Sequence, residues 1–500
     1  MKRKLILLLL VLAMVFTVAA CGKKNDSDRI EITAAYHLLP NGLEPLSEDS
    51  VQNFAIVYHI YDRLVSFDPI NNDWIPAVAK AWTRIDDVTW EFEINLDYTF
   101  SNGDKLTMDD VVFSLLRLRD IPKTADSGNL IADLSYNGNI LTFVTVDASN
   151  TIPSRVLSTA VIVNKKYMET GGDEALFSKP IGTGPYVLTE FTPAASATIE
   201  LRDDYPFAKP QIEVINYIAI AENQPRYMAL ETGEVQYAHF LSANEIALAD
   251  QNNDLTSITA MSRRTNCLTF NCERPPFDDI NVRRALTHAF DRDAFCSLLG
   301  GRPPIKSLLF GNYPDLYIDP TNMPEFNLDK AKEMLAEAGY DASNPLRFEL
   351  LGYSMDPGLE LYQSALKSIG VEMSINMVEL SVFLTAEGSG GFDVINTTQI
   401  NRGNHPLMDL DRFDINMLGM RDISRYYHPR VQELVELMRV ENDAAKLREM
   451  TIEINEILGY EVPMVGTMLQ PIFAAVDKRL TGVVIDPGQT TTFRAAQFNP

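Results

Sequence analysis

The order of apolar segments along the chain is the feature that most restricts its fold. Between residues 30 and 220, short apolar stretches alternate with turns, a pattern typical of strands in a mixed sheet. These stretches are 30–35, 89–94, 141–146, 186–191 and 215–220. From residue 277 the apolar residues recur at helical spacing, and a strand-like segment at 464–475 follows the last helices. The sequence therefore predicts an α/β chain whose last residues return to the first unit and end as loop.

The second half of the chain carries the clearest helix and strand signals. An apolar stripe begins at Val282 behind Asp278 and Asp279, where acidic residues favour a helix start. A second stripe runs over 328–338, with Asn327 as a cap and Gly339 as a left-handed stop. Strands 346–351, 372–378 and 393–397 and helices 359–369, 431–440 and 444–458 follow. This rhythm predicts an independent α/β lobe.

The N-terminus has the features of an export signal. Lys2, Arg3 and Lys4 precede an apolar segment over residues 5–17, and small residues follow at 18–20. Val-Ala-Ala-Cys at 18–21 resembles the lipobox of bacterial lipoproteins, in which the cysteine is lipidated. The sequence therefore predicts a signal peptide over 1–20 and a lipidated Cys21 followed by a polar tether over 21–29. The alternative is an ordinary signal peptide with an accidental cysteine.

Charge and cysteine count exclude several classes of protein. The net charge of −25 disfavours binding to nucleic acid and to anionic headgroups. Residues 31–500 contain no apolar run of the roughly 20 residues that a membrane span needs. With Cys21 assigned to lipid, Cys267, Cys272 and Cys296 cannot all pair, and we interpret them as small apolar side chains of the core. A metal site is disfavoured because His288 is the only nearby histidine.

Sequence motifs of enzymes are missing from the chain. It has no G-x-S-x-G, no H-E-x-x-H and no P-loop, and Gly182-Thr183-Gly184-Pro185 lacks the lysine of a phosphate loop and fits a tight turn before a strand. The acid pairs at 109–110 and 278–279 suit helix starts better than acid/base catalysis. We expect no enzyme activity, no cofactor and no bound metal.

A series of short motifs, in a fixed order, resembles one known family. The motifs are Leu43-Glu44-Pro45, Tyr61-Asp62-Arg63-Leu64-Val65, residues 76–82, residues 100–104, residues 109–114, residues 182–186, residues 230–235 and residues 276–286. Over almost all of the mature chain, this order resembles the extracellular solute-binding proteins of ABC importers, family 5, the peptide/nickel/opine branch. The resemblance implies a two-lobe periplasmic-binding-protein fold (type II, class C) with mixed sheets and a hinge. Lobe one would be 30–261 plus 470–500, and lobe two 262–469.

The resemblance also implies where a solute would bind. In the family, the chain after the first strand lines the cleft, which corresponds to Tyr36, His37, Leu38 and Leu39. The opposite wall corresponds to the loop 401–406. Peptide-binding members place an aspartate four residues before the proline of this loop, but this sequence has Arg402 there. A guanidinium favours an anion over an ammonium group, so Arg402 and His405 are candidate contacts, with Asp409 and Asp411 as alternatives if the alignment slips.

The expected function follows from this resemblance. The chain would capture a small peptide-like or anionic solute between its lobes and deliver it to an ABC permease and its ATPase. It would act as a monomer, outside the cytoplasm, in the periplasm or on the outer face of the cell membrane, anchored through Cys21. The alternatives are a solute-sensing lipoprotein of the same fold and, less favoured, a secreted hydrolase.

Overall fold

A computed structural model gives the fold of most of the chain. It describes residues 29–46, 51–68, 73–121, 124–152, 156, 160–298, 304–307, 318–354, 356–400, 405–417, 422–486 and 488–499. The predicted signal peptide, Cys21 and Arg402 lie outside these residues. Within them, no helix has both the length and the apolar character that a bilayer span requires.

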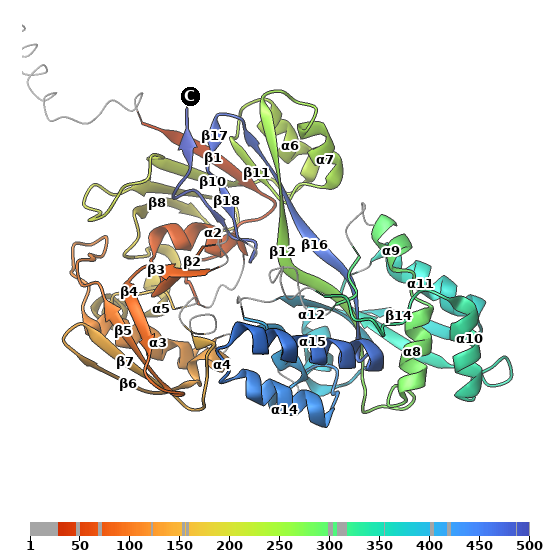
Figure 1. Ribbon diagram of the computed structural model, residues 1–500. Coiled ribbons are helices and arrows are strands. Elements are labelled where there is room, and N and C mark those ends of the chain that lie inside the picture. Colours follow the sequence, from red (N-terminus) through yellow and green to blue (C-terminus); the bar gives the residue numbers. More distant parts are fainter. Residues whose placement is uncertain are drawn as a thin grey trace, which may run out of the picture.

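The first lobe is built mainly from residues 31–249 (Figure 1). Its strands are β1 (Glu31–Tyr36), β2 (Val65–Asp68), β3 (Asp73–Pro76), β4 (Ala79–Arg84), β5 (Thr89–Ile94), β6 (Ile131–Asn137), β7 (Ile140–Thr145), β8 (Tyr186–Thr192), β9 (Ser196–Leu201), β10 (Val214–Ala219) and β11 (Tyr237–His239). Its helices are α2 (Val51–Ile60), α3 (Met108–Asp120), α4 (Ala125–Gly128), α5 (Lys165–Ser178), α6 (Asn223–Glu231) and α7 (Ala243–Ala249).

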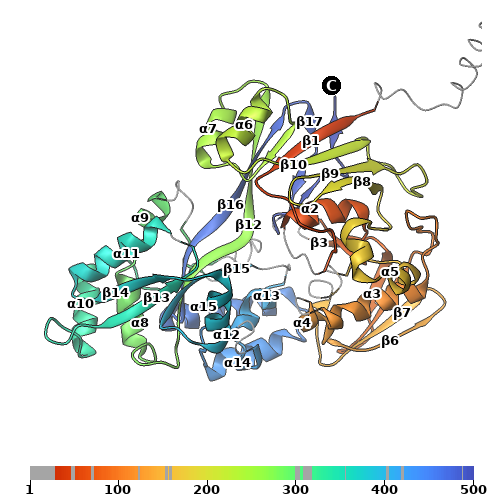
Figure 2. The ribbon, with the colours of Figure 1, turned by 180° about the vertical axis from the view of Figure 1, so that it is seen from behind.

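The second lobe follows, and two long strands connect it to the first (Figure 2). The long strands are β12 (Leu255–Phe270) and β16 (Met464–Asp477). Between them lie α8 (Ile280–His288), α9 (Arg292–Leu298), α10 (Leu328–Glu337), β13 (Arg347–Gly352), α11 (Pro357–Ser368), β14 (Glu372–Met377), α12 (Leu380–Ser389), β15 (Val394–Ile400), α13 (Leu407–Leu410), η3 (Asp411–Phe413), η4 (Ile415–Met417), α14 (Pro429–Met438) and α15 (Ala444–Glu461).

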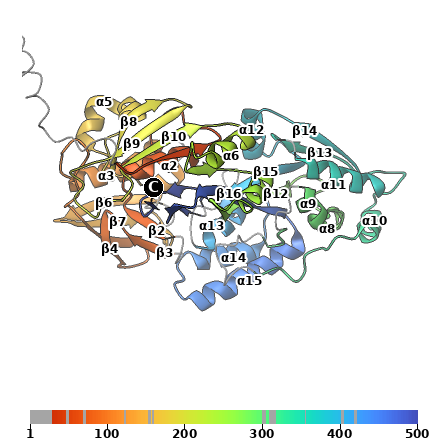
Figure 3. The same cartoon turned by 90° about the horizontal axis from the view of Figure 1, so that it is seen from above.

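One ten-stranded sheet runs through both lobes. Its strand order is β14-β13-β15-β12-β16-β11-β1-β10-β9-β8, so β12 and β16 lie at its centre (Figure 3). β12 and β16 pair antiparallel along most of their length, with a register shift between Met261 and Thr265. A separate four-stranded sheet, β4-β5-β7-β6, belongs to the first lobe. The fold is the predicted two-lobe α/β architecture with mixed sheets.

Each lobe has its own apolar core. The core of the first lobe collects side chains from Ile32 to Tyr237 and adds Phe493 and Phe498 from the end of the chain. The second lobe buries one cluster between the sheet and α8, α10 and α11, and another beneath α13, α14 and α15. Separate cores allow each lobe to stay rigid while the connection between them bends.

Most predicted elements of the second half are confirmed, together with the groups that cap them. Asp279 accepts the backbone N–H of Asn281 at the start of α8, and Asn327 accepts that of Lys330 at the start of α10. Gly339 has the left-handed φ of +89° expected after α10. These local signals succeeded because capping depends on neighbouring residues only.

Two expectations about the rest of the chain need adjustment. The prediction that the chain ends as loop is wrong, because β17 (Leu480–Thr481), β18 (Val484–Ile485), β19 (Thr491–Thr492) and β20 (Gln497–Phe498) form two small antiparallel pairs. Cys267 and Cys296 are buried as expected, whereas Cys272 is only half-buried. Short strands of two residues carry too little periodicity to be recognised from sequence.

Candidate functional site

The carboxyl ends of the parallel strands in the two lobes point toward each other. In the first lobe, β1 is parallel to β10 and β11, and β11 ends at His239. In the second lobe, β13 is parallel to β14 and β15, and β15 ends at Ile400. His239 and Ile258 of β12 pair with the same residue of β16, which lies between them in the sheet. Ile400, by contrast, pairs directly with Arg264 of β12. About six residues of β12, or about 20 Å, therefore separate the two edges.

This region between the lobes is the candidate solute site. Ligands of open α/β sheets bind beyond the carboxyl ends of the strands, where the following loops present backbone and side-chain groups. Here two such edges face each other, so a solute between them would contact both lobes.

Residues 36–39 extend from the end of β1 at the edge of the first lobe. Tyr36 is fully buried among Tyr217, Tyr237 and His239, and Leu39 is also buried in the core. By contrast, Leu38 is 46% exposed and His37 is half-buried. In this conformation Tyr36 and Leu39 pack in the core, and the solute contact of residues 36–39 stays a prediction.

Arg226 organises the loops that follow β10 and β11. Its guanidinium, from α6, donates to the carbonyls of His239 at 2.8 Å and Phe240 at 2.6 Å. It also donates to the carbonyls of Ile220 and Ala221 and to the side chain of Asn223. A buried guanidinium with five acceptors fixes both loops in one geometry, because each N–H loses a bond if a loop moves. The sequence motifs did not indicate Arg226, since four of its five acceptors are main-chain carbonyls.

Two histidines at this edge are held neutral. Burial, followed by the nearby His37 and Arg226, lowers the pKa of His239 to about 3. Burial, and then Arg226, also lowers the pKa of His37. The His37 ring meets Phe240 edge-on at 5.0 Å, and its buried Nδ1 has no hydrogen-bond partner among the described residues. His37 therefore offers a neutral polar group at the edge.

The second lobe places its three described candidates around α13. His405 accepts the backbone N–H of Leu407 at its Nδ1, 3.2 Å away, and burial lowers the pKa of His405 to about 4. Asp409 and Asp411 are buried, and Asp409 pairs with the buried Arg412 at 3.3 Å. These contacts give Asp409 a structural role in the cluster beneath α14 and α15. Its role as a solute contact, like that of Asp411, stays a prediction.

Arg264 is a further candidate that the motif comparison missed. It lies beside the register shift in β12 and opposite the last residue of β15. Its Nε is buried, and no hydrogen-bond or ion-pair partner for it occurs among the described residues. The two consecutive arginines at 263–264, inside a strand expected to cross between lobes, are the sequence signal that could have found it.

Several acidic and glycine residues of the sequence motifs have structural roles. No group of three His, Cys, Asp or Glu side chains in this part of the chain comes together as a metal site. Asp110 belongs to the capping box of α3 with Thr107, and Asp279 caps α8, so these acids have structural partners. Gly182 and Gly184 form the turn before β8 and pack against the carbonyls of Ile60 and His59.

The fold and this site define a two-lobe solute-binding protein, and comparison with known proteins specifies the family. The sequence profile described as "Bacterial extracellular solute-binding proteins, family 5 Middle" matches residues 73–416. This chain belongs to that family, whose members are solute-binding proteins.

Individual relatives agree with this assignment. Di/tripeptide-binding protein 2 of Pseudomonas aeruginosa is 25% identical, over 92% of this chain and 93% of the relative. The nickel-binding periplasmic protein of Escherichia coli is also 25% identical, over 73% of this chain and 74% of the relative. Among solved structures, HbpA2 from Haemophilus parasuis has a TM-score of 0.82 at 21% identity, covering 94% of this chain and 100% of that one. At this identity the structural likeness shows the fold.

Proposed function

We propose that this chain captures a peptide-like or anionic solute between its two lobes and delivers it to the permease of an ABC importer. The observation that carries the proposal is the placement of two buried polar atoms at the facing edges, Nδ1 of His37 and Nε of Arg264, for which the described residues offer no hydrogen-bond partner. Buried polar groups are almost always hydrogen-bonded, so a ligand is the natural partner for these two. The relatives that bind dipeptides support the choice of solute class.

The mechanism proposed is closure about the β12–β16 connection. A solute that contacts both edges binds the closed form more tightly than the open form and shifts the population toward closure. Arg264 would neutralise a carboxylate or other anion, because a guanidinium offers a planar fork to such groups. Arg226 would keep the opposing loops in place while the lobes move. Arg402, outside the described residues, stays a second candidate for the anion.

The predicted location is the outer side of the cell membrane, with a lipid on Cys21. The lipobox-like residues 18–21 support this proposal. Several acyl chains on one cysteine would hold the protein at the membrane, because each buried methylene contributes about 0.8 kcal/mol. Incorporation of labelled fatty acid into the wild type, and its loss together with membrane retention in Cys21→Ser, is the expected result. An unlabelled wild-type chain would instead indicate an ordinary signal peptide.

The solute is tested by mass spectrometry of small molecules released when the purified lipid-free chain is denatured. Any released compound is then added back in a thermal-shift assay. We expect a peptide or an anion that raises the melting temperature of the wild type and binds in a stoichiometric ratio without being converted. Turnover of the compound would favour a hydrolase. Binding without uptake by cells that carry the neighbouring permease would favour a solute sensor.

A further inference from the structure

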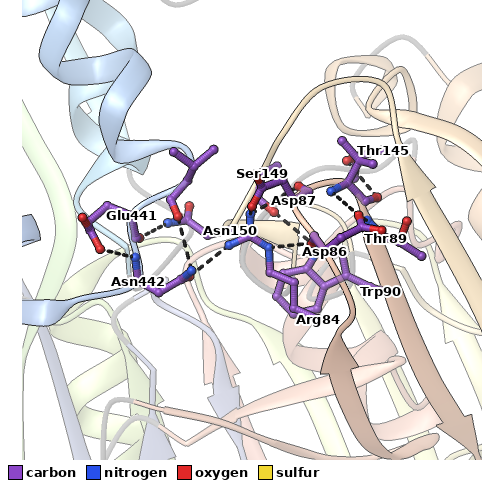
Figure 4. A network of polar contacts seen from close by, with 12 residues as sticks. Arg84, Asp86, Asp87, Thr89, Trp90, Thr145, Ser149, Asn150, Glu441 and Asn442 are labelled. Atoms are coloured by element: carbon purple, nitrogen blue, oxygen red, sulfur yellow. Dashed lines mark hydrogen bonds and ion pairs between the residues drawn. The ribbon is translucent and has the colours of Figure 1, made fainter.

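The two lobes meet a second time, at a place that shares no strand with the ten-stranded sheet. Asn150 lies in the loop after β7, in the part of the first lobe that contains the four-stranded sheet. Its backbone N–H donates to the carbonyl of Arg439 at 3.0 Å. Its side-chain Nδ2 donates to the carbonyls of Met438 at 3.1 Å and Glu441 at 2.6 Å (Figure 4).

The acceptors are carbonyls at the end of α14 and in the turn that follows it. The last four carbonyls of a helix have no partner within the helix and need one from outside. Met438 and Arg439 end α14, and Asn150 supplies donors to both from the other lobe. Because three carbonyls surround the donors, the amide nitrogen of Asn150, and not its oxygen, must face α14.

Arg84 adds a second bond between the lobes. Its Nη1 donates to the side-chain oxygen of Asn442 at 3.1 Å. The same guanidinium donates to the carbonyl of Asp86 at 3.1 Å and to the carboxylate of Asp87 at 3.1 Å, within its own lobe. The β4–β5 turn therefore holds the Arg84 guanidinium in position independently of its contact with the second lobe.

Both partners are hydrogen-bonded to residues on their own side (Figure 4). In the first lobe, the indole N–H of Trp90 donates to the carbonyl of Ser149, and the N–H of Ser149 donates to the carbonyl of Asp87. In the second lobe, the carboxylate of Glu441 accepts the N–H groups of Asn442 and Asp443. Pre-ordered partners lose little conformational entropy when they meet.

We propose that Asn150 and α14 form a closure latch that stabilises the closed form of the protein without any contact to the solute. The proposal adds to the hinge closure proposed above and rests on it. Opening about β12 and β16 separates the two lobes and exchanges these hydrogen bonds for bonds to water. Each such exchange changes the ratio of closed to open protein by only about fivefold, so the latch biases the equilibrium and does not lock it. The latch sets a fraction of closed protein that exists before solute arrives, and this fraction scales the apparent affinity for any solute.

The test measures lobe separation in the solute-free, lipid-free chain. Spin labels on non-cysteine side chains at the exposed positions of Asp97 and Glu337, one in each lobe, report the distance by double electron–electron resonance. The wild type should show a closed population. Asn150→Asp keeps the shape but directs a carboxylate at Met438 and Glu441, so the ratio of closed to open protein should fall about tenfold or more.

Two further variants make the result specific. Asn253→Asp introduces the same charge at an exposed position of the first lobe and should leave the distances unchanged. Asn442→Ala removes the bond from Arg84 and, within the second lobe, the bond from Nδ2 of Asn442 to the carbonyl of Val440. It leaves the three bonds of Asn150 in place, so it should shift the ratio in the same direction by a smaller factor, and it keeps the test valid if Asn150→Asp folds poorly. Wild-type chain that is entirely open, or identical distances in Asn150→Asp and wild type, would overturn the latch. Neither result depends on which solute binds.

Discussion

Nε2 of His59 accepts the backbone N–H of Phe493 at 3.0 Å, which joins helix α2 to a segment 434 residues later in the chain. On the other side of the ring, Nδ1 donates to the carbonyl of Ala55 at 2.9 Å. These two contacts require the neutral imidazole, with its proton on Nδ1. Arg494, next in sequence to Phe493, pairs with Asp62 and donates to the carbonyls of Tyr58 and Tyr61. The C-terminal segment is thus bound to the first lobe by these hydrogen bonds and this ion pair.

The first prediction concerns the pH dependence of stability. Burial, and then Arg494, lowers the pKa of His59 to about 3, compared with 6.5 when exposed. A lowered histidine pKa means that the unfolded chain binds the proton first, so the stabilisation is complete above pH 6.5 and is lost as the pH falls from 6.5 toward 3. At about pH 5.5 the loss from His59 should be about 1.4 kcal/mol.

The measurement is urea unfolding of wild type and His59→Gln at a series of values from about pH 7.5 down to about pH 5, which brackets the ordinary pKa of histidine. The difference between the two free energies of unfolding should shrink by about 1.4 kcal/mol at about pH 5.5, because all other titrating groups cancel in the difference. A pH-independent difference would show that His59 is not held neutral.

A second prediction concerns the buried ion pair between Glu44 and Arg117. The two charged atoms lie 3.0 Å apart, and both side chains are buried, at 2% and 7% exposure. Glu44→Gln removes a carboxylate that lies 3.0 Å from the buried guanidinium of Arg117, which should cost about 3–5 kcal/mol in the free energy of unfolding. The control is Glu372→Gln in the exposed pair with Arg347, at 2.7 Å, where the loss should be below about 1 kcal/mol. Equal losses in both variants would contradict the burial argument.

A third prediction tests the turn before β8. A Cβ atom at Gly182 would lie 2.1 Å from the carbonyl oxygen of Ile60. Because that oxygen is main-chain and also accepts the N–H of Gly184, it cannot yield easily. Gly182→Ala should destabilise the chain by about 2–3 kcal/mol in thermal unfolding. In Gly391→Ala the nearest atom is the flexible hydroxyl of Ser389 at 3.4 Å, so stability should change by less than about 0.5 kcal/mol.

A fourth prediction tests Arg264 as the contact for an anion. Arg264→Met keeps most of the apolar stem but removes the guanidinium, so affinity for the solute released from wild type should fall about tenfold or more. Arg347→Met, an exposed arginine of the second lobe, should not change affinity. The measurement is isothermal titration calorimetry. If Arg264→Met leaves the affinity unchanged, Arg402→Ala is measured in the same way. A loss of affinity in Arg402→Ala would then place the anion contact at Arg402, and no loss would remove both arginines from the site.

Local signals in the sequence predicted much of the fold correctly. The caps Asp279 and Asn327 and the stop at Gly339 act on neighbouring backbone groups, so their effect depends on a few adjacent residues. The stripe from Val282 fixes which face of α8 is buried, because helical periodicity places these residues on one side. The family motifs, spread over most of the chain, predicted the two-lobe architecture.

The candidate site was less accessible from sequence. Position after the first strand suggested Tyr36 to Leu39 as one group. In the structure Tyr36 and Leu39 are buried whereas Leu38 is exposed, a difference that depends on packing against distant segments and not on the local sequence. Neither Arg226 nor Arg264 belongs to a sequence motif. Most acceptors of Arg226 are main-chain carbonyls, which any sequence provides. The position of Arg264 becomes relevant only through the pairing of β12 with β15.

The sequence by itself determined the class of chain, through the periodicities that define strands and helices and the ordered motifs of a solute-binding family. These properties depend on short segments. The tertiary structure alone decided that His59 meets Phe493 and that Asn150 reaches the end of α14. Such contacts join residues hundreds of positions apart, and their energy depends on a geometry that no local pattern records. The same holds for the facing edges of the two lobes, because they arise from the register of β12 and β16.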